Sequence, residues 1–512
     1  MRLLPTPVHV EWQGGSFALP DPLPVRGSGP GARLLAGRLI VAAGLTTTNT
    51  SAAGIDFHRV DDLPPEGYHL TVTGVGITIR AADDAGERWA VQTLLQLLPA
   101  QIHGPGPMVP DSLVVPCVSI MDFPTFAWRG SMVDVARHFL PMAGLLKHLD
   151  VMAAHKLNVL HLHLSDDQGW RMPVTKYPRL TELGAWRPGT LPGHQPPPDE
   201  NDRDDFPQHD GLRHGGSYTV DELRTLVARA TELGITVMPE IDMPGHMEAA
   251  IAAYPQFGAC DHVAYPRTCF GVSHHVLRLS DEAVDFCTDV LDAAMDLFPG
   301  SPIHIGGDEC PSREWFTDPV TLATMAQHGL STGPEAQAWF ERRICEHVLA
   351  AGRRVVVWDE VLEFGAPEGV TVMVWRERAA IAEAAAQGFD VIAAPSRYTY
   401  LDYGQYHTDD QPLTIGGPLL LEEVTGLADE LRLPPGHSER LLGGQFQLWS
   451  EYVPTWGRAE YLMWPRGSSL AQQLWAGHPG ESGTLVGLGR HLQRLTAMEL
   501  AWCRAPRSPV EA

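Results

Sequence analysis

Beyond Phe123 the chain repeats one pattern, in which a short apolar segment is followed by a longer amphipathic one. The apolar segments have the length of buried strands, and the segments 142–156 and 220–234 between them place apolar residues at helical spacing. Eight such repeats are typical of a (β/α)₈ TIM barrel. The predicted strands are residues 127–135, 158–166, 236–242, 302–308, 353–360, 370–376, 389–395 and 445–452.

A doubly wound open sheet is the alternative architecture for this alternation of strands and helices. Nucleotide-binding sheets of that kind carry a glycine-rich GxGxxG or Walker loop directly after a strand. None of the predicted strands is followed by such a loop. We therefore predict an α/β fold in which residues 119–512 form a closed barrel.

The first 118 residues follow a different pattern. Residues 66–81 alternate like two strands joined at a Gly-Val-Gly turn, which indicates a hairpin. Residues 86–99 have helical spacing and end at a proline, and the segment 104–116, rich in Pro and Gly, is typical of a linker. The sequence thus predicts a small α+β domain at 1–118, ahead of the barrel domain.

Polar side chains lie at the ends of the predicted barrel strands. In the second strand, Leu160, Leu162 and Leu164 share one face, and because side chains alternate, His161 and His163 share the other. Catalytic groups of barrel enzymes lie at the carboxyl ends of the strands. The polar or aromatic residues found there are Asp166, Asp167, Glu240, Asp242, Asp308, Glu309, Trp358, Trp375, Trp449 and Glu451. The pattern predicts an active site at this face.

The segment HIGGDEC, residues 304–310, ends in two adjacent carboxylates, Asp308 and Glu309, with no basic residue beside them. Like charges side by side disfavour mutual ionisation, so the pKa of one of them should rise. In a cleft, such a pair supplies a general acid next to an ionised carboxylate. A solvated turn after a strand explains the same two residues, but the polar ends of the other strands favour the catalytic interpretation.

Composition and charge restrict the partners of the chain. The formal net charge of −25 argues against nucleic acids, anionic membrane surfaces and acidic polymers, and suits a neutral or cationic substrate. No apolar run approaches the length of a membrane span. The chain has 14 tryptophans, which is many for its length, and indole faces are common platforms for sugar rings. Nothing in the sequence indicates an oligomer.

The N-terminus and the cysteines bear on the cellular compartment. Residues 1–15 contain no apolar stretch long enough for a signal peptide, so we expect a cytoplasmic protein, or a secreted one if the sequence is a mature form. Seven cysteines without a CxxC pair or zinc spacing favour free thiols. Cys260 and Cys269 could bridge a loop only in an exported protein.

Several motifs occur together, in order and at predicted strand ends: WRGSMVDVARHF, HKLNVLHLHLSDDQGWR, MPEIDMPGH, HIGGDE, YLD and LWSE. In this combination the chain resembles family 20 glycoside hydrolases, the β-N-acetylhexosaminidases, over residues 66–452. The resemblance implies a retaining exo-hydrolase of terminal β-linked GlcNAc or GalNAc. It also implies a small oligosaccharide as substrate, such as a chitooligosaccharide or a glycan end, and no metal or organic cofactor.

The resemblance assigns a role to each site residue. The 2-acetamido oxygen of the substrate itself attacks C1, the exception to the two-carboxylate scheme of glycosidases. Glu309 is the implied general acid and later the base, Asp308 the acceptor for the acetamido N–H, and Tyr400 the donor to its oxygen. The implied sugar-binding residues are Trp358, Trp375 and Trp449 around the acetyl methyl, Arg137 at the 3- and 4-hydroxyls, and Asp402 and Glu451 at the 4- and 6-hydroxyls.

The implied supporting residues are Asp166, Asp167, Asp242, His246 and His304. His246 is expected to hydrogen-bond near Glu309 and help set its pKa, with Asp242 fixing the tautomer of the imidazole. A loop-capping aspartate and a surface histidine are the alternatives for this pair, and a structural ion pair is the alternative for Arg137.

Other functions stay open on the sequence. A narrower enzyme with the same chemistry, chitobiase-like or lacto-N-biosidase-like, fits the same motifs. His161 and His163 on one face of a strand also suit a metal-dependent barrel hydrolase, with His304, His246 or Asp308 as third ligand, although the pair lies in mid-strand. A non-catalytic sugar-binding module would need a broken acid pair. The Pro- and Asp-rich residues 188–216 are expected to form a loop over the barrel mouth that shapes the aglycone side.

Overall fold

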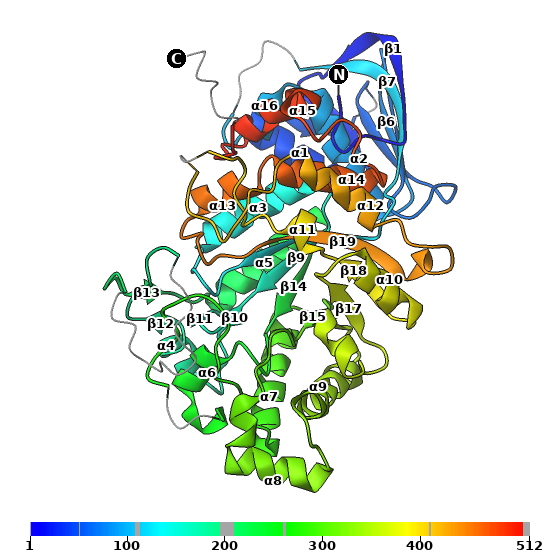
Figure 1. Cartoon of the computed structure of the whole chain (residues 1–512). Helices are drawn as coiled ribbons and strands as arrows, with labels where there is room; N and C mark the ends of the chain where they lie inside the picture. Colours follow the sequence, from blue (N-terminus) through cyan, green and yellow to red (C-terminus); the bar gives the residue numbers. More distant parts are fainter. Residues whose placement is uncertain are drawn as a thin grey trace.

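The computed structural model describes residues 2–50, 52–107, 113–194, 209–259, 263–408 and 411–504. An N-terminal unit, blue to cyan in Figure 1, packs against a barrel whose strands run from cyan through green and yellow to orange. No described helix is long and apolar enough to cross a membrane.

The N-terminal unit is a seven-stranded sheet in the order β1-β7-β5-β6-β4-β2-β3, with two packed helices. β5 and β6 pair antiparallel, as the predicted hairpin requires. The predicted helix at 86–99 is α2, which the Asp83 side chain caps by accepting from the Gly86 N–H. The bounds are β1 His9–Ala18, β2 Leu23–Arg26, β3 Thr47–Thr48, β4 Ile55–Arg59, β5 Tyr68–Thr73, β6 Gly76–Ala81, β7 Val114–Asp122, α1 Pro30–Ala43 and α2 Asp84–Leu97.

The predicted linker is in part a strand. Its last residues, 114–116, begin β7, which pairs with both β1 and β5 and continues to Asp122, past the expected boundary at 118. Pro116 argued against a strand in the sequence, but it lies opposite Ser16, beside an irregularity in the register of β1 where a ladder bond is lost at small cost. Residues 108–112 of the segment lie outside the described part of the chain.

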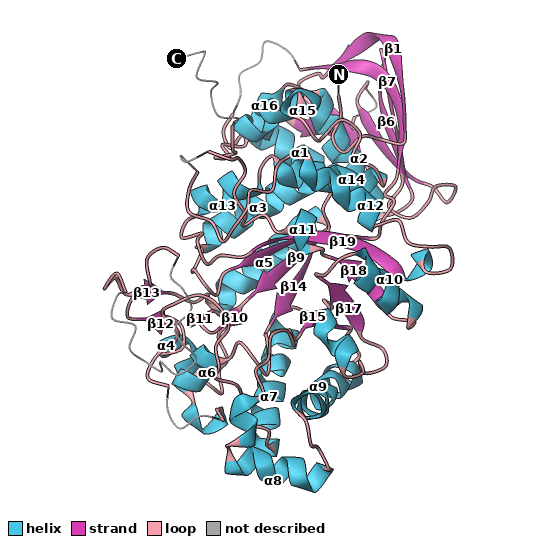
Figure 2. Ribbon diagram, in the orientation of Figure 1, coloured by secondary structure: helices cyan, strands magenta, loops and turns pink. Residues whose placement is uncertain are grey.

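Eight parallel strands close the barrel in the order β8-β9-β14-β15-β16-β17-β18-β19, and β19 pairs with β8. Each predicted strand is present, and the open sheet is wrong. Figure 2 shows these strands in magenta with helices in cyan around them. The bounds are β8 Trp128–Asp134, β9 Val159–His163, β14 Thr236–Glu240, β15 Ile303–His304, β16 Val355–Trp358, β17 Thr371–Val374, β18 Asp390–Ala393 and β19 Leu441–Leu448.

Helices follow most barrel strands. The predicted helices at 142–156 and 220–234 are α3 and α5, and α5 begins with a capping box of Thr219 and Glu222. β16 and β17 are joined through a 3₁₀ turn at Asp359–Glu363. The bounds are α3 Met142–Ala154, α4 Arg179–Glu182, α5 Val220–Leu233, α6 Glu248–Ala253, α7 Asp281–Leu297, α8 Pro319–His328, α9 Gly333–Ala350, α10 Arg378–Ala386, α11 Ser396–Thr399, α12 Leu427–Glu430, α13 Trp456–Met463, α14 Arg466–Ala476, α15 Leu485–Leu488 and α16 Arg490–Ala497.

The alternation along β9 sorts its side chains as predicted. Leu160, Leu162 and Leu164 are buried in the apolar layer between the barrel and its helices. His161 and His163 face the bore, where both approach the carboxylate of Glu240. Apolar side chains therefore fix the helices to the outside of the barrel, while the bore is left for polar chemistry.

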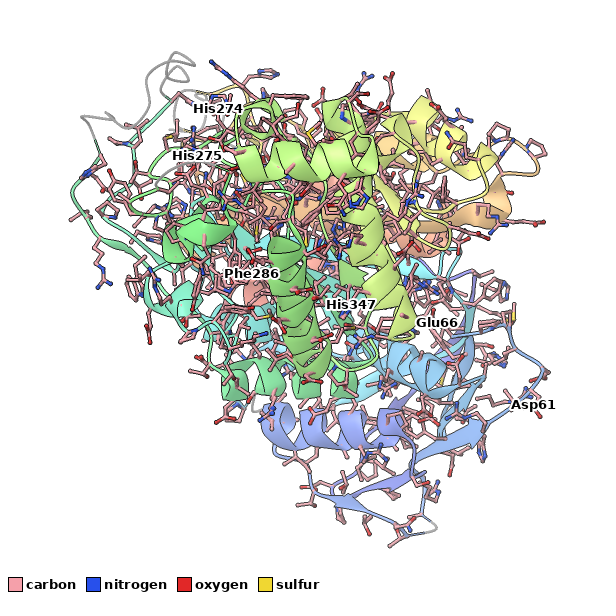
Figure 3. All side chains as sticks on the ribbon, turned by 90° about the horizontal axis from the view of Figure 1, so that it is seen from below. Asp61, Glu66, His274, His275, Phe286 and His347 are labelled. Atoms are coloured by element: carbon pink, nitrogen blue, oxygen red, sulfur yellow. The ribbon has the colours of Figure 1, made fainter. Side chains whose placement is uncertain are left out.

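The N-terminal unit and the barrel share a border through the end of the chain. Trp475, at the end of α14, is buried in the core of the N-terminal unit, 6.2 Å from Trp89 between ring centroids. Glu66, which Figure 3 labels at this border, lies 2.7 Å from Arg129 of β8 and accepts from the indole N–H of Trp89. The two units thus form one packed body.

Candidate active site

The glycines of HIGGDEC end β15 after His304 and turn its continuation toward the mouth of the bore. Gly306 and Gly307 have φ of 70° and 98°, and a Cβ on Gly306 would overlap the carboxylate of Asp242. Glu309 itself has φ of 44°, a strained value for a residue with a side chain. This turn places Asp308 deep, with 16% of its side chain exposed, and leaves half of the Glu309 side chain exposed.

The pKa values of the acid pair shift in opposite directions, and each shift is the reverse of what the implied roles require. Burial raises the pKa of Asp308, and the negative charge of Glu240 raises it further. Burial and the charge of Asp308 likewise raise the pKa of the neighbouring Asp242. The imidazole of His246 lowers the pKa of Glu309. Burial and the nearby partners of each group, more than the adjacency of the two acids, therefore set the direction in which each pKa moves.

His246 lies between two pairs of acids. Its Nε2 is 3.6 Å from Glu309 Oε2 and 4.0 Å from Asp308 Oδ2. Its Nδ1 is 3.2 Å from Asp166 Oδ1 and 3.3 Å from Asp167 Oδ2. Although burial opposes it, the carboxylate of Asp166 raises the pKa of His246 well above its usual value.

The expectation that Asp242 fixes the tautomer of His246 is wrong. Asp166 and Asp167 face Nδ1, whereas Asp242 accepts from the Gly307 N–H at 3.0 Å and hydrogen-bonds Asp308. Asp242 reaches the turn because the glycines there bring its backbone close. The aspartate is therefore a support for the HIGGDEC turn rather than for the imidazole.

Arg137 follows β8 and is held by carboxylates. Its Nη2 is 2.8 Å from Asp166 Oδ2, its Nη1 is 3.5 Å from Asp134 Oδ2, and its guanidinium lies 4.9 Å from the Trp449 ring. The structural ion pair considered as the alternative is thus present. The side chain still keeps 11% of its surface exposed at the site, which fits a role in both structure and binding.

An aromatic wall lines the site, formed by Trp358, Trp375, Trp449 and Tyr400 in one apolar cluster inside the barrel. Trp358 donates to Glu240 at 2.9 Å and Trp375 donates to Glu360. Burial raises the pKa of Tyr400 well above its usual value, so the phenol stays neutral, and it accepts a hydrogen bond from Trp449. Its own O–H is thereby available as a donor.

Buried acceptors at the site have no hydrogen-bond partner among the described residues. These atoms are Oδ1 of Asp308, both carboxyl oxygens of Asp402 and Oε2 of Glu451. Burial, together with the charge of Glu451, raises the pKa of Asp402 well above its usual value, and burial raises that of Glu451. Unpaired buried acceptors are costly, so their gathering at one place indicates a ligand that donates several hydrogen bonds.

Below the site, Glu240 organises the histidines of the bore. His161 Nε2 lies 3.0 Å from Glu240 Oε2, and His304 Nδ1 lies 3.1 Å from Oε1. His163 approaches the same carboxylate at 2.5 Å and Asp166 at 2.9 Å. Burial alone would raise the pKa of Glu240, but these imidazoles hold it well below its usual range. A buried carboxylate such as Glu240 needs hydrogen-bond donors. This need explains why His161 and His163 lie in mid-strand, and it does not require the metal site considered as the alternative.

Three buried acids near Asp308 were missed by the sequence reasoning. Burial raises the pKa of Glu360 and of Glu341 to about 8, and that of Asp359 to about 6. Glu360 and Asp359 follow directly on Trp358, so the strand-end rule could have found them. Glu341 lies on α9, and its contact with the HIGGDEC turn depends on how that helix packs.

The loop expected over the barrel mouth is described only at its base. β12 (Trp186–Arg187) and β13 (His214–Gly215) pair antiparallel, and the His194 ring lies 4.9 Å from that of Tyr452, next to Glu451. The loop therefore leaves from and returns to the site. Residues 195–208 lie outside the described part of the chain, and so does Cys260 of the Cys260–Cys269 pair.

The chemistry at this face is that of a glycoside hydrolase, since carboxyl groups for proton transfer lie against an aromatic wall. Residues 126–478 match the family described as "Glycosyl hydrolase family 20, catalytic domain", and residues 1–123 match its "domain 2". The chain belongs to glycosyl hydrolase family 20.

Named relatives agree with this family. The chain is 35% identical over 491 residues to a beta-hexosaminidase of Porphyromonas gingivalis, covering 93% of this chain and 60% of that protein's length. The solved GH20 beta-N-acetylhexosaminidase from Streptomyces coelicolor A3(2) has a TM-score of 0.82 at 30% identity, covering 99% and 98% of the two chains. The GH20 exo beta-N-acetylglucosaminidase from Vibrio harveyi, solved in complex with N-acetylglucosamine, has a TM-score of 0.84 at 30% identity, covering 99% and 78%.

Proposed function

We propose that the chain is a retaining exo-β-N-acetylhexosaminidase that removes terminal β-linked GlcNAc or GalNAc by substrate-assisted catalysis. The names of the relatives support the activity, and the complex of the Vibrio harveyi enzyme with N-acetylglucosamine supports a sugar of this class. The observation that carries the mechanism is the largely buried Asp308 next to the half-exposed Glu309, with Oδ1 of Asp308 unpartnered among the residues that the structure describes.

In the proposed reaction Glu309 gives its proton to the glycosidic oxygen while the C1–O bond breaks. The acetamido oxygen of the same sugar bonds to C1 and forms a cyclic oxazolinium ion, whose ring nitrogen carries positive charge. Asp308 accepts from the acetamido N–H and offsets that charge. Water then attacks C1 and loses a proton to Glu309, the ring opens, and the sugar leaves with its β configuration.

The proposed reaction needs Glu309 protonated and Asp308 ionised, whereas the pKa shifts in the free enzyme run against both states. Substrate binding supplies the change. An N–H at Asp308 stabilises its ionised form and lowers its pKa, and a sugar over Glu309 removes water from a side chain that is now half exposed and raises its pKa. Bound substrate therefore favours the protonation state that the reaction needs.

The other residues account for selection of the sugar. The indole rings of Trp358, Trp375 and Trp449 are proposed to surround the acetyl methyl, with the Tyr400 hydroxyl at the acetamido oxygen. Asp402 and Glu451 supply the unpartnered acceptors for the 4- and 6-hydroxyls, and Arg137 meets the 3- and 4-hydroxyls. A site that closes around the hydroxyls of one terminal sugar favours exo action.

A panel of p-nitrophenyl glycosides tests the proposal. β-N-acetylglucosaminide and β-N-acetylgalactosaminide should be cleaved, whereas β-glucoside and β-galactoside, which lack the acetamido group, should not. Efficient cleavage of the glycosides without the acetamido group would overturn substrate assistance. Release of an intact disaccharide from p-nitrophenyl lacto-N-bioside or diacetylchitobioside, without release of a monosaccharide, would favour the narrower relatives instead.

A further inference from the structure

The gap between His246 and the acid pair has an unusual width. Nε2 of His246 lies 3.6 Å from Glu309 Oε2 and 4.0 Å from Asp308 Oδ2. Both separations exceed the donor–acceptor distance of a good N–H···O hydrogen bond, which is about 2.7–3.2 Å. His246 is buried, with an exposed fraction of 3%. Its Nε2 nevertheless has no hydrogen-bond partner among the described residues, and neither does Oδ1 of Asp308.

This spacing is that of two ligands on one small cation. Zinc binds imidazole nitrogen and carboxylate oxygen at about 2.0–2.2 Å, so two ligands at tetrahedral angles lie about 3.4 Å apart. Asp242, His246 and Asp308 each offer a ligand atom, and these atoms lie within 4.8 Å of one another. One imidazole nitrogen and two carboxylate oxygens can therefore hold one ion and leave its fourth position to water.

The second nitrogen of the imidazole is already arranged as in metal sites. Metal-binding histidines almost always donate their other ring N–H to a carboxylate, which fixes the tautomer and orients the ring. Nδ1 of His246 faces Asp166 at 3.2 Å and Asp167 at 3.3 Å. Because the free imidazole has a raised pKa and carries a proton on both nitrogens, zinc must displace the proton on Nε2, and the lone pair then points at Asp308 and Glu309.

Charge and ligand type narrow the choice of cation. The acids Asp242, Asp308 and Glu309 crowd one space, and a divalent cation offsets their repulsion. An imidazole ligand and four-fold geometry suit zinc, whereas magnesium and calcium require six or more oxygen ligands. The half-exposed Glu309 leaves a route from solvent to the ion.

A second group of metal-binding side chains, His161, Glu240 and His304, does not offer the same site. All three side chains are fully buried, and the imidazoles already approach the Glu240 carboxylate at hydrogen-bond distance. An ion there would have to break those contacts and would have no described path from solvent. The space beside His246 is the better candidate.

We propose that Zn²⁺ binds reversibly between Asp242, His246 and Asp308, beside Glu309, and inhibits the enzyme by occupying Asp308. The ion is an inhibitor here and not a cofactor. The proposal that zinc binds rests on the geometry alone. The proposal that zinc competes with the substrate also rests on the proposed function.

Titration of the purified protein with ZnCl₂ by calorimetry tests the binding. The experiment is made at pH 8, because a metal-bound imidazole nitrogen carries no proton. His246→Asn is the test variant, since Asn tolerates the φ of 53° at this position and keeps a donor toward Asp166. Zinc affinity should fall by at least about tenfold in this variant. MgCl₂ should give no comparable binding.

His347→Gln is the matched control. His347, labelled in Figure 3, lies on α9, 2.7 Å from Asp292, in an ordinary surface pair away from the acid pair. It should leave the affinity unchanged. Anomalous diffraction at the zinc edge should place the ion beside His246. Unchanged affinity in His246→Asn, or an ion located only elsewhere, would overturn the site.

Kinetics separate this proposal from the proposed function. Zinc should raise the KM for p-nitrophenyl β-N-acetylglucosaminide without changing kcat, and EDTA should reverse the effect. Zinc inhibition that leaves KM unchanged and lowers kcat would contradict binding at the acid pair. If the chain cleaved no N-acetyl sugar, the proposed function would fail while the calorimetric result would still decide the zinc site.

Discussion

Two regions of the molecule bury charged side chains at similar depth, but they treat them differently. At the border between the N-terminal unit and the barrel, Lys156 lies 2.6 Å from Asp122 and donates to Tyr68 at 2.8 Å. The second oxygen of Asp122 accepts from the indole N–H of Trp475 at 2.9 Å. None of the polar side-chain atoms in this cluster lacks a partner among the described residues.

The active site also buries charged side chains, but some of their polar atoms have no hydrogen-bond partner among the described residues. Asp308, Asp402 and Glu451 are buried or nearly so, yet each has a carboxyl oxygen with no partner in the part of the chain that the structure describes. Burial of unpaired polar groups costs stability, whereas a completed network holds the fold together. Between these two regions, partner saturation rather than burial or charge separates the structural cluster from the groups that are proposed to bind a ligand. Five predictions test this contrast.

The largest effect is expected for Glu309→Gln. Loss of general-acid assistance should lower kcat/KM by about 10²–10⁴-fold for sugars with poor leaving groups, and much less for activated aryl glycosides, which need less protonation. The measurement is a series of aryl leaving groups of graded pKa, assayed with wild type and variant. An equal fall across the series would show that Glu309 is not the acid.

Lys156→Met should break the saturated region. It leaves Asp122 as an uncompensated buried charge, which typically costs about 3–5 kcal/mol of unfolding free energy. Urea unfolding measures the loss, and kcat/KM of the folded fraction should not change. The control is Lys176→Met, whose pair with Asp289 is 64% exposed on the lysine side and should cost less than about 1 kcal/mol. Equal effects of the two substitutions would contradict the distinction.

Asp308→Asn should act on catalysis and spare the fold. The carboxylate matters most when the acetamido nitrogen gains charge, so kcat should fall by about 10²–10³-fold with a modest change in KM. Because Asp308 is buried with a raised pKa, the melting temperature should stay the same or rise.

A thiazoline mimic of the oxazoline intermediate should inhibit wild type strongly and Asp308→Asn much less. A 2-fluoro glycosyl fluoride without the acetamido group probes the competing idea that Asp308 is a covalent nucleophile. Mass spectrometry should find no glycosyl adduct on Asp308. Such an adduct would replace substrate assistance with the two-carboxylate mechanism.

Two buried histidines should each lower the stability of the protein at acid pH, in contrast to buried acids of the site such as Glu341, whose raised pKa of about 8 has the opposite effect. Burial lowers the pKa of His155 to about 4 and that of His103 to about 3, against about 6.5 in the unfolded chain. The folded imidazoles stay neutral while the unfolded chain binds protons, so their stabilisation is full above about pH 6.5 and is lost as the pH falls toward 4. At pH 5 His155 alone should cost about 2 kcal/mol.

Urea unfolding at pH 7.5 and pH 5 measures this loss in wild type and in His155→Gln, which keeps hydrogen-bonding capacity but cannot titrate. The variant should lose less stability between the two pH values. The half-buried His347 on α9 serves as the control, and His347→Gln should follow wild type. A pH dependence that is identical in all three proteins would assign the loss to other groups.

The smallest effect is expected for chelation. Because the proposed nucleophile comes from the substrate, dialysis against EDTA should leave kcat/KM unchanged apart from release of any inhibitory zinc. Loss of activity that zinc restores would favour the metal hydrolase built on His161 and His163. Metal analysis of the purified protein gives the matching stoichiometry.

The sequence predicted the barrel well because strand burial is periodic. Leu160, Leu162 and Leu164 alternate with polar bore residues, and that alternation is readable without knowledge of the partners. The end of the N-terminal unit was misplaced because Pro116 and the flanking glycines hid a strand whose pairing with β1 is non-local.

The sequence predicted which residues form the site more easily than which of these residues contact one another. Strand ends and the family resemblance named the acids, but the partner of His246 was misassigned. Which carboxylate meets an imidazole depends on backbone angles such as the φ of 53° at His246, which no periodicity reveals. Glu341 was missed for a similar reason, since its approach to Gly307 is set by the position of α9.

The burial of Trp475 in the core of the N-terminal unit has a consequence for synthesis of the chain. During synthesis the seven strands of that unit leave the ribosome first. The indole of Trp475, which packs near Trp89 and donates to Asp122, emerges only when the barrel is nearly complete. The unit that is made first is therefore finished last. A truncated chain that ends before α14 should leave Trp89 and Leu94 uncovered, and separate expression of the N-terminal unit should yield an aggregation-prone product.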